Sequence, residues 1–239
     1  MEPEEESRPT GVPCDYDADP GRYRLGMRST RAHTAADLYG RVARLLGELG
    51  AHAVLDVGCA DGVLRAALAA PGPWLVGLDT SAMLLRDHPA PVVQADAARL
   101  PVRDRVFDAV TALNVLYHLA DPTPALREAR RVLRPGGHLV AAAIARADSP
   151  ELSRYWTRPE TSFDAEDAPD LLARVFDPVT VFPWDAPLVT LPDATAVRDY
   201  LVGRQVPLDT ALTAARELRA PLSVTKRGAL IVAGRSRRP

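Results

Sequence analysis

The chain has 239 residues, of which 47% are hydrophobic, so it is long enough to bury a sizeable core as one domain. Its formal net charge is −2, which excludes a global basic field for nucleic acid. Two cysteines without a C-x-x-C pair argue against a structural zinc site or a disulfide framework, and no apolar run reaches the length of a membrane span.

Residues 1–20 are acidic and rich in proline and aspartate, and we expect a disordered tail followed by one domain over 21–239. The acidic start is the opposite of a signal peptide, so the expected setting is cytoplasmic. Residues 23–34 mix aromatic side chains with arginines. An amphipathic helix is predicted from Leu38 to Leu49, with Gly50 as its stop.

Residues 53–64 predict a buried strand, a glycine turn and the start of a helix. A Cβ at Gly58 or Gly62 would push the backbone away from a bound ligand, and the turn points helix N–H groups at that ligand. A dinucleotide site requires G-x-G-x-x-G, but the register from Gly58 has Ala60 and Val63 at the other two positions. Pyrophosphate binding is therefore disfavoured.

A second buried strand over 74–78 ends in Asp79, 21 residues beyond Gly58. That interval is expected for a carboxylate that accepts hydrogen bonds from both hydroxyls of a ribose. The alternative is that Asp79 caps the helix that starts near Ser81.

Three more elements follow in the same alternating order. A third strand is predicted over 91–95, before Asp96, and a fourth over 107–113, which runs into Asn114. A helix over 124–133 and a fifth strand over 138–145 flank the segment Arg134-Pro135-Gly136-Gly137.

These segments in this order resemble the class I S-adenosylmethionine (SAM)-dependent methyltransferases, in particular the ubiquinone/menaquinone-biosynthesis group. Motif I, D/E-x-G-x-G-x-G, is matched by Asp56, Gly58 and Gly62, with Ala60 in place of the middle glycine; F-D-x-V and L-R-P-G-G follow, and the resemblance covers residues 35–146. It implies an α/β fold: a doubly wound, Rossmann-like, seven-stranded and mostly parallel sheet with an antiparallel last strand, plus a small helical cap or insertion. The implied cofactor is SAM, and its product is S-adenosylhomocysteine.

The resemblance also implies roles for individual residues. Asp96 would accept from the adenine amine while the N–H of Ala97 donates to a ring nitrogen, although Asp96 alone also fits an Asx-turn. Backbone at Gly58 and Leu113 would serve the methionine amine, and Arg28 or Arg24 would cover the carboxylate unless the arginine is simply solvated. The remaining cofactor contacts are expected at Asp56, Cys59, Ala60, Gly62, Thr80, Met83 and Asn114.

Methyl transfer from a sulfonium mainly requires positioning, and a base is needed only when the acceptor must lose a poorly acidic proton. His118 and its neighbour Tyr117 follow the fourth strand, so His118 is the candidate base; the alternative is that it binds a loop carbonyl or covers the cofactor. Tyr23, Tyr155 and Trp156 are candidate walls of an acceptor pocket. The other histidines are expected at the surface: His33, His52, His88 and His138.

Residues 146–220 depart from the resemblance, and we expect them to include a substrate-side cap or insertion. Helices are predicted over 171–176, 194–202 and 210–218. Strand six is predicted over 179–184, with an extension over 187–191, and strand seven over 230–234.

The sequence therefore predicts a SAM-dependent methyltransferase that acts on a small-molecule acceptor, in secondary metabolism, without a metal. Membrane association and nucleic-acid binding are not expected, while a homodimer and the methylated atom (O, N or C) are left open. Two alternatives stand beside this reading. One is an rRNA or tRNA methyltransferase with Arg22, Arg24, Arg28 and Arg31 as a phosphate patch, and the other is a SAM-binding protein without transferase activity.

Overall fold

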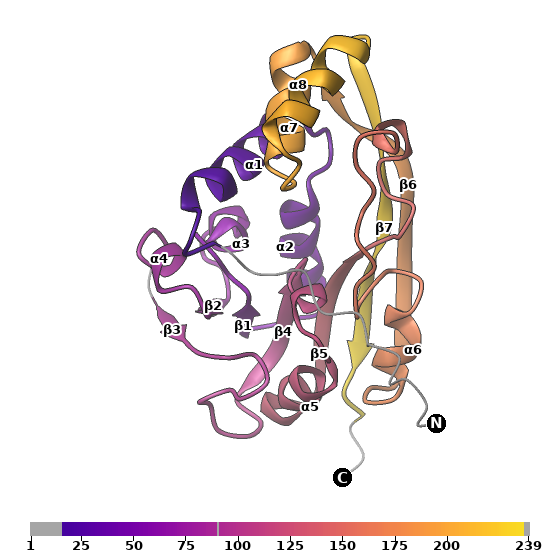
Figure 1. The fold of residues 1–239 in the computed structure, drawn as a ribbon. Coiled ribbons are helices and arrows are strands. Elements are labelled where there is room, and N and C mark those ends of the chain that lie inside the picture. Colours follow the sequence, from indigo (N-terminus) through magenta and orange to yellow (C-terminus); the bar gives the residue numbers. More distant parts are fainter. Residues whose placement is uncertain (1–15, 90, 237–239) are drawn as a thin grey trace, which may run out of the picture.

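The computed structural model describes residues 16–89 and 91–236, which form a single seven-stranded sheet with helices packed around it (Figure 1). The strand order is β3-β2-β1-β4-β5-β7-β6; β1 to β5 are parallel, and β7 is antiparallel to both β5 and β6. The predicted sheet, with its antiparallel last strand, is confirmed. The strands are β1 (Ala53–Val57), β2 (Trp74–Asp79), β3 (Val92–Gln94), β4 (Phe107–Leu113), β5 (Leu133–Ile144), β6 (Val179–Leu191) and β7 (Leu222–Gly234).

The two faces of the sheet are covered by different helices. Strand β1 is buried along its whole length, and its alternate residues enter two separate apolar clusters. Leu55 packs with residues of α5 (Thr123–Val132) and α6 (Ala168–Ala173), whereas Val54 packs with α2 (Leu38–Glu48) and α3 (Val63–Ala67). The short helix α4 (Ala82–Leu85) follows β2. Because both faces are covered, the carboxyl ends of the strands remain the accessible edge for a ligand.

A helical cap lies beyond this edge and is built from both ends of the chain. Helices α7 (Ala194–Val202) and α8 (Leu208–Glu217) are inserted between β6 and β7, and they form an apolar cluster of their own with the extended ends of those strands. Helix α1 (Pro20–His33) lies against α7 (Figure 1). A Cβ at Gly203 would lie 2.4 Å from the Cα of Gly26, so the two helices meet where neither has a side chain.

Several elements differ from the prediction. Strands β6 and β7 have 13 residues each because they continue past the sheet to carry the cap, where Leu191 pairs with Leu222. Strand β5 begins at Leu133 instead of 138. Helix α1 was not predicted, and the predicted tail boundary at residue 20 lies inside the folded part, since Asp17 contacts Ser81. The tail prediction for residues 1–15 lies outside the described residues. His88 is buried and not at the surface, because it packs between Gly62 and Gly77.

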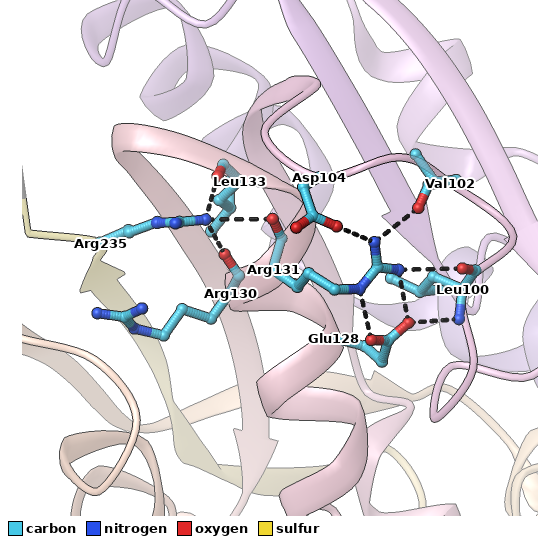
Figure 2. A network of polar contacts seen from close by, with 8 residues as sticks. All are labelled: Leu100, Val102, Asp104, Glu128, Arg130, Arg131, Leu133 and Arg235. Carbon is cyan, nitrogen blue, oxygen red and sulfur yellow. Dashed lines mark hydrogen bonds and ion pairs between the residues drawn. The ribbon is translucent and has the colours of Figure 1, made fainter. Parts of the chain in front are cut away.

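Two arginines fix the C-terminal end of α5 (Figure 2). The Arg131 guanidinium binds both carboxylate oxygens of Glu128, at 2.6 and 2.7 Å, and also binds Asp104 and the carbonyls of Leu100 and Val102. Arg235 donates to the carbonyls of residues 130, 131 and 133. The last carbonyls of a helix have no partner within it, so Arg235 satisfies groups that would otherwise need water.

None of the helices between residues 16 and 236, residue 90 apart, combines the length and the apolar composition that crossing a bilayer would require.

Candidate active site

A cavity of about 360 Å³ lies at the carboxyl ends of β1, β2 and β4, and we call it the strand-end cavity. Open α/β sheets bind their ligands at this edge. Most of the predicted site residues come together here from distant parts of the sequence. Those that line it are Tyr23, Gly58, Ala60, Asp79, Thr80, Asp96, Ala97, Leu113, Asn114, Tyr117 and His118.

The glycine turn closes tightly onto the sheet. The N–H groups of Gly58 and Cys59 both donate to the carbonyl of Leu78, which ties the end of β1 to β2. Gly58 has φ +71°, and a Cβ there would lie 2.4 Å from Cγ2 of Val115. Ala60 also has a positive φ, +47°, at the position where the family motif has its middle glycine. The turn thus needs left-handed backbone even where the sequence supplies a methyl group.

Asp79 is buried at the end of β2 and is held in place by backbone donors. One carboxylate oxygen accepts from the N–H of Ala60 at 3.0 Å, and the other from the N–H of Ser81 at 2.9 Å. Each oxygen retains a second lone pair, so the carboxylate can still accept two hydroxyls. The helix cap proposed as the alternative is made by Ser81 instead, whose hydroxyl accepts from the N–H of Leu84.

Asp96 and Asn114 add polar groups on either side. Oδ1 of Asp96 accepts from the N–H of Ala98 at 2.8 Å, which is the Asx-turn foreseen as the alternative, and its exposed side chain still lines the cavity. Asn114 has φ +56°, and its Oδ1 is buried with no hydrogen-bond partner. A buried acceptor without a donor is costly, and Asn114 lines the cavity, so a donor supplied by a ligand would satisfy it.

Asp56 lies one layer below the cavity, inside the sheet. Its carboxylate accepts the hydroxyl of Thr111 from the neighbouring strand β4 at 2.6 Å. Burial raises the pKa of Asp56 to about 7; the Thr111 hydrogen bond opposes this shift, and the charge of Asp79 adds to it. Asp56 therefore supports the floor of the site and does not line it.

Four other predicted cofactor contacts do not line the strand-end cavity. Cys59 is buried behind the turn, where burial raises the pKa of its thiol, and Gly62 begins α3 and faces His88 and Pro89. Met83 lies in α4, and Arg28 is exposed on α1. The helical periodicity of α1 explains the difference for Arg28. The cavity face of α1 carries Tyr23, Met27 and Thr30, so the arginine one position after Met27 points away from that face.

A second cavity of about 260 Å³ adjoins the first, and we call it the cap cavity. The two share walls on α1 and on the segment after β4, where Tyr117 and His118 lie. The hydroxyl of Tyr16 is 2.8 Å from Nε2 of His118. His118 thus lies at the junction of the two cavities, where a group bound in one would meet a group bound in the other.

Of the predicted acceptor walls, Tyr23 and Trp156 line the cap cavity, but Tyr155 does not. The hydroxyl of Tyr155 donates to Glu217 at the surface of the cap, and Arg154 lies over its ring. Adjacent residues in an irregular segment point in different directions, so the pair Tyr155-Trp156 is divided between the surface and the cavity.

Sequence reasoning missed the residues that close the site from the N-terminal side. Tyr16, Met27 and Thr30 line both cavities, as does Ile144 at the end of β5. A signal for α1 was present in Asp19 and Pro20, because Asp19 accepts from the N–H of Arg22 as an N-cap and proline is favoured at the first helical position.

Residues 55–141 match the profile of the family described as "Methyltransferase domain". This part of the chain is similar to a methyltransferase domain. The matched region runs from β1 into β5 and contains the glycine turn, Asp79, Asp96 and His118.

Curated relatives also align with part of the chain. The chain is 44% identical over 90 residues to a demethylmenaquinone methyltransferase of Mycolicibacterium vanbaalenii, covering 36% of this chain and 40% of that protein. It is 38% identical over 140 residues to the protein of that name from Mycolicibacterium paratuberculosis, covering 56% and 60% of the two chains. The chain therefore matches about half of the length of these relatives.

The fold continues beyond that region. The crystal structure of the [4+2]-cyclase SpnF superimposes with a TM-score of 0.62 at 18% identity and covers 95% of this chain and 99% of that one. At this identity the likeness concerns the fold alone.

Proposed function

We propose that this chain transfers a methyl group from SAM to a small-molecule acceptor, with the strand-end cavity as the cofactor site and the cap cavity as the acceptor site. The observation that carries the proposal is the junction of the two cavities at Tyr117 and His118. Two reactants in adjoining cavities can meet without crossing solvent, which is the requirement for a positioned displacement.

The residues of the strand-end cavity fit SAM part by part. Asp79 retains two lone pairs for the ribose hydroxyls, and the unpartnered Oδ1 of Asn114 matches the ammonium group of the methionine end. Gly58 leaves room where a Cβ would collide with Val115. Asp96 keeps one carboxylate oxygen outside its Asx-turn for the adenine amine, next to the backbone of Ala97.

When bound, SAM would supply an electrophilic methyl group on a good leaving group. The chain itself has to orient the acceptor, exclude water and, where required, take a proton. Tyr16, Tyr23 and Met27 line both cavities, so we assign the exclusion of water at the junction to them. We assign the proton to Nε2 of His118, which an acceptor hydroxyl reaches either directly or through the hydroxyl of Tyr16.

The names of the curated relatives support a small-molecule acceptor, since both are named as methyltransferases of demethylmenaquinone. A role in secondary metabolism is part of our proposal. The RNA alternative is weakened by the environment of its arginines. Arg24 pairs with Asp87 at 3.0 Å and Arg31 with Asp61 at 3.3 Å, so part of the patch is already neutralised by carboxylates.

Calorimetric titration with SAM tests the proposal. The wild-type protein should bind SAM, and Asp79→Ala should weaken binding by about 10-fold or more, because hydrogen bonds to a charged group each contribute about 1.5–3 kcal/mol. The matched control is Asp170→Ala, an exposed carboxylate on α6 that leaves the cavity unchanged. Absence of SAM binding by the wild type, or equal affinities for the two variants, would contradict the cofactor assignment.

Turnover separates the enzyme from the binding protein without activity. Release of S-adenosylhomocysteine in the presence of small-molecule extract fractions supports transfer, and binding of SAM without release from any fraction supports the non-catalytic alternative.

A further inference from the structure

Four basic side chains line the cap cavity but not the strand-end cavity: Arg22, Arg158, Arg204 and Lys226. Two of them carry the argument below, Arg204, which follows α7, and Lys226, in β7. Both lie on the cap side of the junction at His118. A group that they bind is therefore held apart from the atom that receives the methyl group.

Arg204 is held flat by aromatic stacking. Its guanidinium carbon lies 3.3 Å from the ring centroid of Tyr200 and 5.7 Å from that of Trp156. One N–H group donates to the carbonyl of Tyr200 at 2.9 Å, and no carboxylate among residues 16–89 and 91–236 pairs with this guanidinium. Four of its five donors and its full charge thus remain for a ligand.

Lys226 is the only lysine in a chain that otherwise uses arginine for its cations. Its ammonium pairs with the buried carboxylate of Asp148 and lies 3.2 Å from the hydroxyl of Ser149. Asp148 is itself fixed by the N–H of Arg227 at 2.8 Å. An ammonium has three donors, so one remains for the cavity that it lines.

The charges lining the cap cavity do not cancel. Asp148 compensates Lys226, and the buried carboxylate of Asp164 compensates Arg158. Arg22, the fourth basic group, donates to the carbonyl of Gly203. Arg204 has no carboxylate partner within the described ranges. A ligand with a negative charge would compensate Arg204, whereas a neutral ligand would leave this half-buried cation without a counter-charge.

The aromatic lining and the small volume of the cap cavity favour a small, flat ligand. Aromatic rings line it from three segments, at Tyr23, Tyr117 and Trp156, and flat rings pack best against other flat groups. Its volume of about 260 Å³ is below the usual range of about 300–1,000 Å³ for ligand pockets, which favours a small acceptor.

We infer that the acceptor is a small planar aromatic acid whose anionic group binds Arg204 and Lys226 while a second, nucleophilic atom lies at the junction beside His118. This inference rests on the proposed methyl transfer and deepens it, because it names the chemical class of the acceptor and assigns specificity to two residues.

The test uses hydroxybenzoates and hydroxynaphthoates, each paired with its methyl ester, titrated into the full-length protein saturated with S-adenosylhomocysteine. We expect at least one acid to bind about 10-fold more tightly than its ester, since a charge-assisted contact is roughly twice as strong as a neutral one. Arg204→Gln and Lys226→Gln should each remove most of that preference. Arg204→Lys should restore part of it, because it returns the charge without the planar fork.

Arg154→Gln is the matched control, since it removes one positive charge from an exposed side chain of the cap outside the cavity, and it should leave the preference unchanged. Affinity for S-adenosylhomocysteine should be the same in all these proteins. Equal binding of acids and esters, no binding of any acid at millimolar concentration, or an unchanged preference in both Gln variants would overturn the inference while cofactor binding persists. Failure of the proposed function would appear differently, as loss of cofactor binding by the wild type.

Discussion

The hydroxyl of Tyr16 lies 2.8 Å from Nε2 of His118, and their rings meet edge to face although 102 residues separate them in the chain. The contact joins the segment before α1 to the segment after β4, and both residues line the two cavities where they adjoin. It also holds in place Nε2 of His118, the atom that we propose as the acceptor of the substrate's proton.

The first prediction concerns this pair. His118→Gln should lower kcat by about 100-fold or more, which is the usual contribution of a positioned general base, and should remove the limb of the pH–rate profile that reflects this base. Tyr16→Phe keeps the ring and loses the hydroxyl, so it should lower kcat by less. Release of S-adenosylhomocysteine with an accepted substrate measures both effects.

The control is His52→Gln, an exposed histidine before β1 whose side chain lies outside both cavities. If His118→Gln retained the wild-type rate and profile, His118 would only cover the site and the acceptor would need no base.

The second prediction concerns the glycine turn. Gly58→Ala places a methyl group at φ +71° and 2.4 Å from Val115, so it should lower the free energy of unfolding by about 2 kcal/mol or more and weaken SAM binding. Gly47→Ala is the matched control: no atom lies within 4 Å of its added Cβ, and alanine favours the helix by about 0.5–1 kcal/mol. Urea unfolding measures both, and equal effects of the two substitutions would refute the steric argument.

The third prediction concerns the buried carboxylate of Asp56. Because burial raises its pKa from 3.8 to about 7, the folded state holds the proton to higher pH than the unfolded chain does. The free energy of unfolding of the wild type should therefore fall by up to about 4 kcal/mol as the pH rises from about 4 to about 7. Above that range Asp56 should cause no further decrease.

Asp56→Asn removes this titration and keeps an acceptor for the Thr111 hydroxyl. The free energy of unfolding of the variant, relative to the wild type, should rise across the same pH window and then level off. Urea titrations at several pH values without cofactor measure the difference. Parallel curves for the two proteins would show that Asp56 titrates at its ordinary pKa in the fold.

Local patterns predicted the central sheet well, because each buried parallel strand is a short apolar run that ends in a turn or an acid. Asp79 follows this rule: its place at the tip of β2 depends only on the strand before it. The same holds for Asn114 after β4. The strand-end cavity is thus largely a product of local sequence, and most of its predicted lining residues come together in the structure.

The cap cavity could not be predicted in the same way, because its walls come from segments that meet only in the folded chain. Arg204 and Lys226 follow α7 and lie in β7, with α8 between them. At the cap, β6 and β7 pair only with each other, and their side chains are buried against the cap helices instead of against helices that cover the central sheet. Helix α1 was overlooked because tyrosine, methionine and threonine on its cavity face give no simple apolar stripe.

The fourth prediction concerns Arg131, whose guanidinium joins Glu128 to Asp104 and two carbonyls of the preceding loop (Figure 2). Arg131→Met leaves these acceptors without their charged donor, so the free energy of unfolding should fall by about 2 kcal/mol. Arg127→Met is the matched control on the same helix, because that side chain is exposed and its removal should change stability by less than about 0.5 kcal/mol.

The pH dependence gives a second readout for this network. The hydrogen bond from Arg131 holds the pKa of Glu128 below its usual value of 4.5, so the stabilisation is present above that pH and is lost as the pH falls through the depressed pKa. The difference in the free energy of unfolding between the wild type and Arg131→Met should therefore be smaller below pH 4 than at pH 7. Urea unfolding at both pH values measures it. A difference that stays constant with pH would mean that Arg131 acts through packing of its aliphatic stem and not through Glu128.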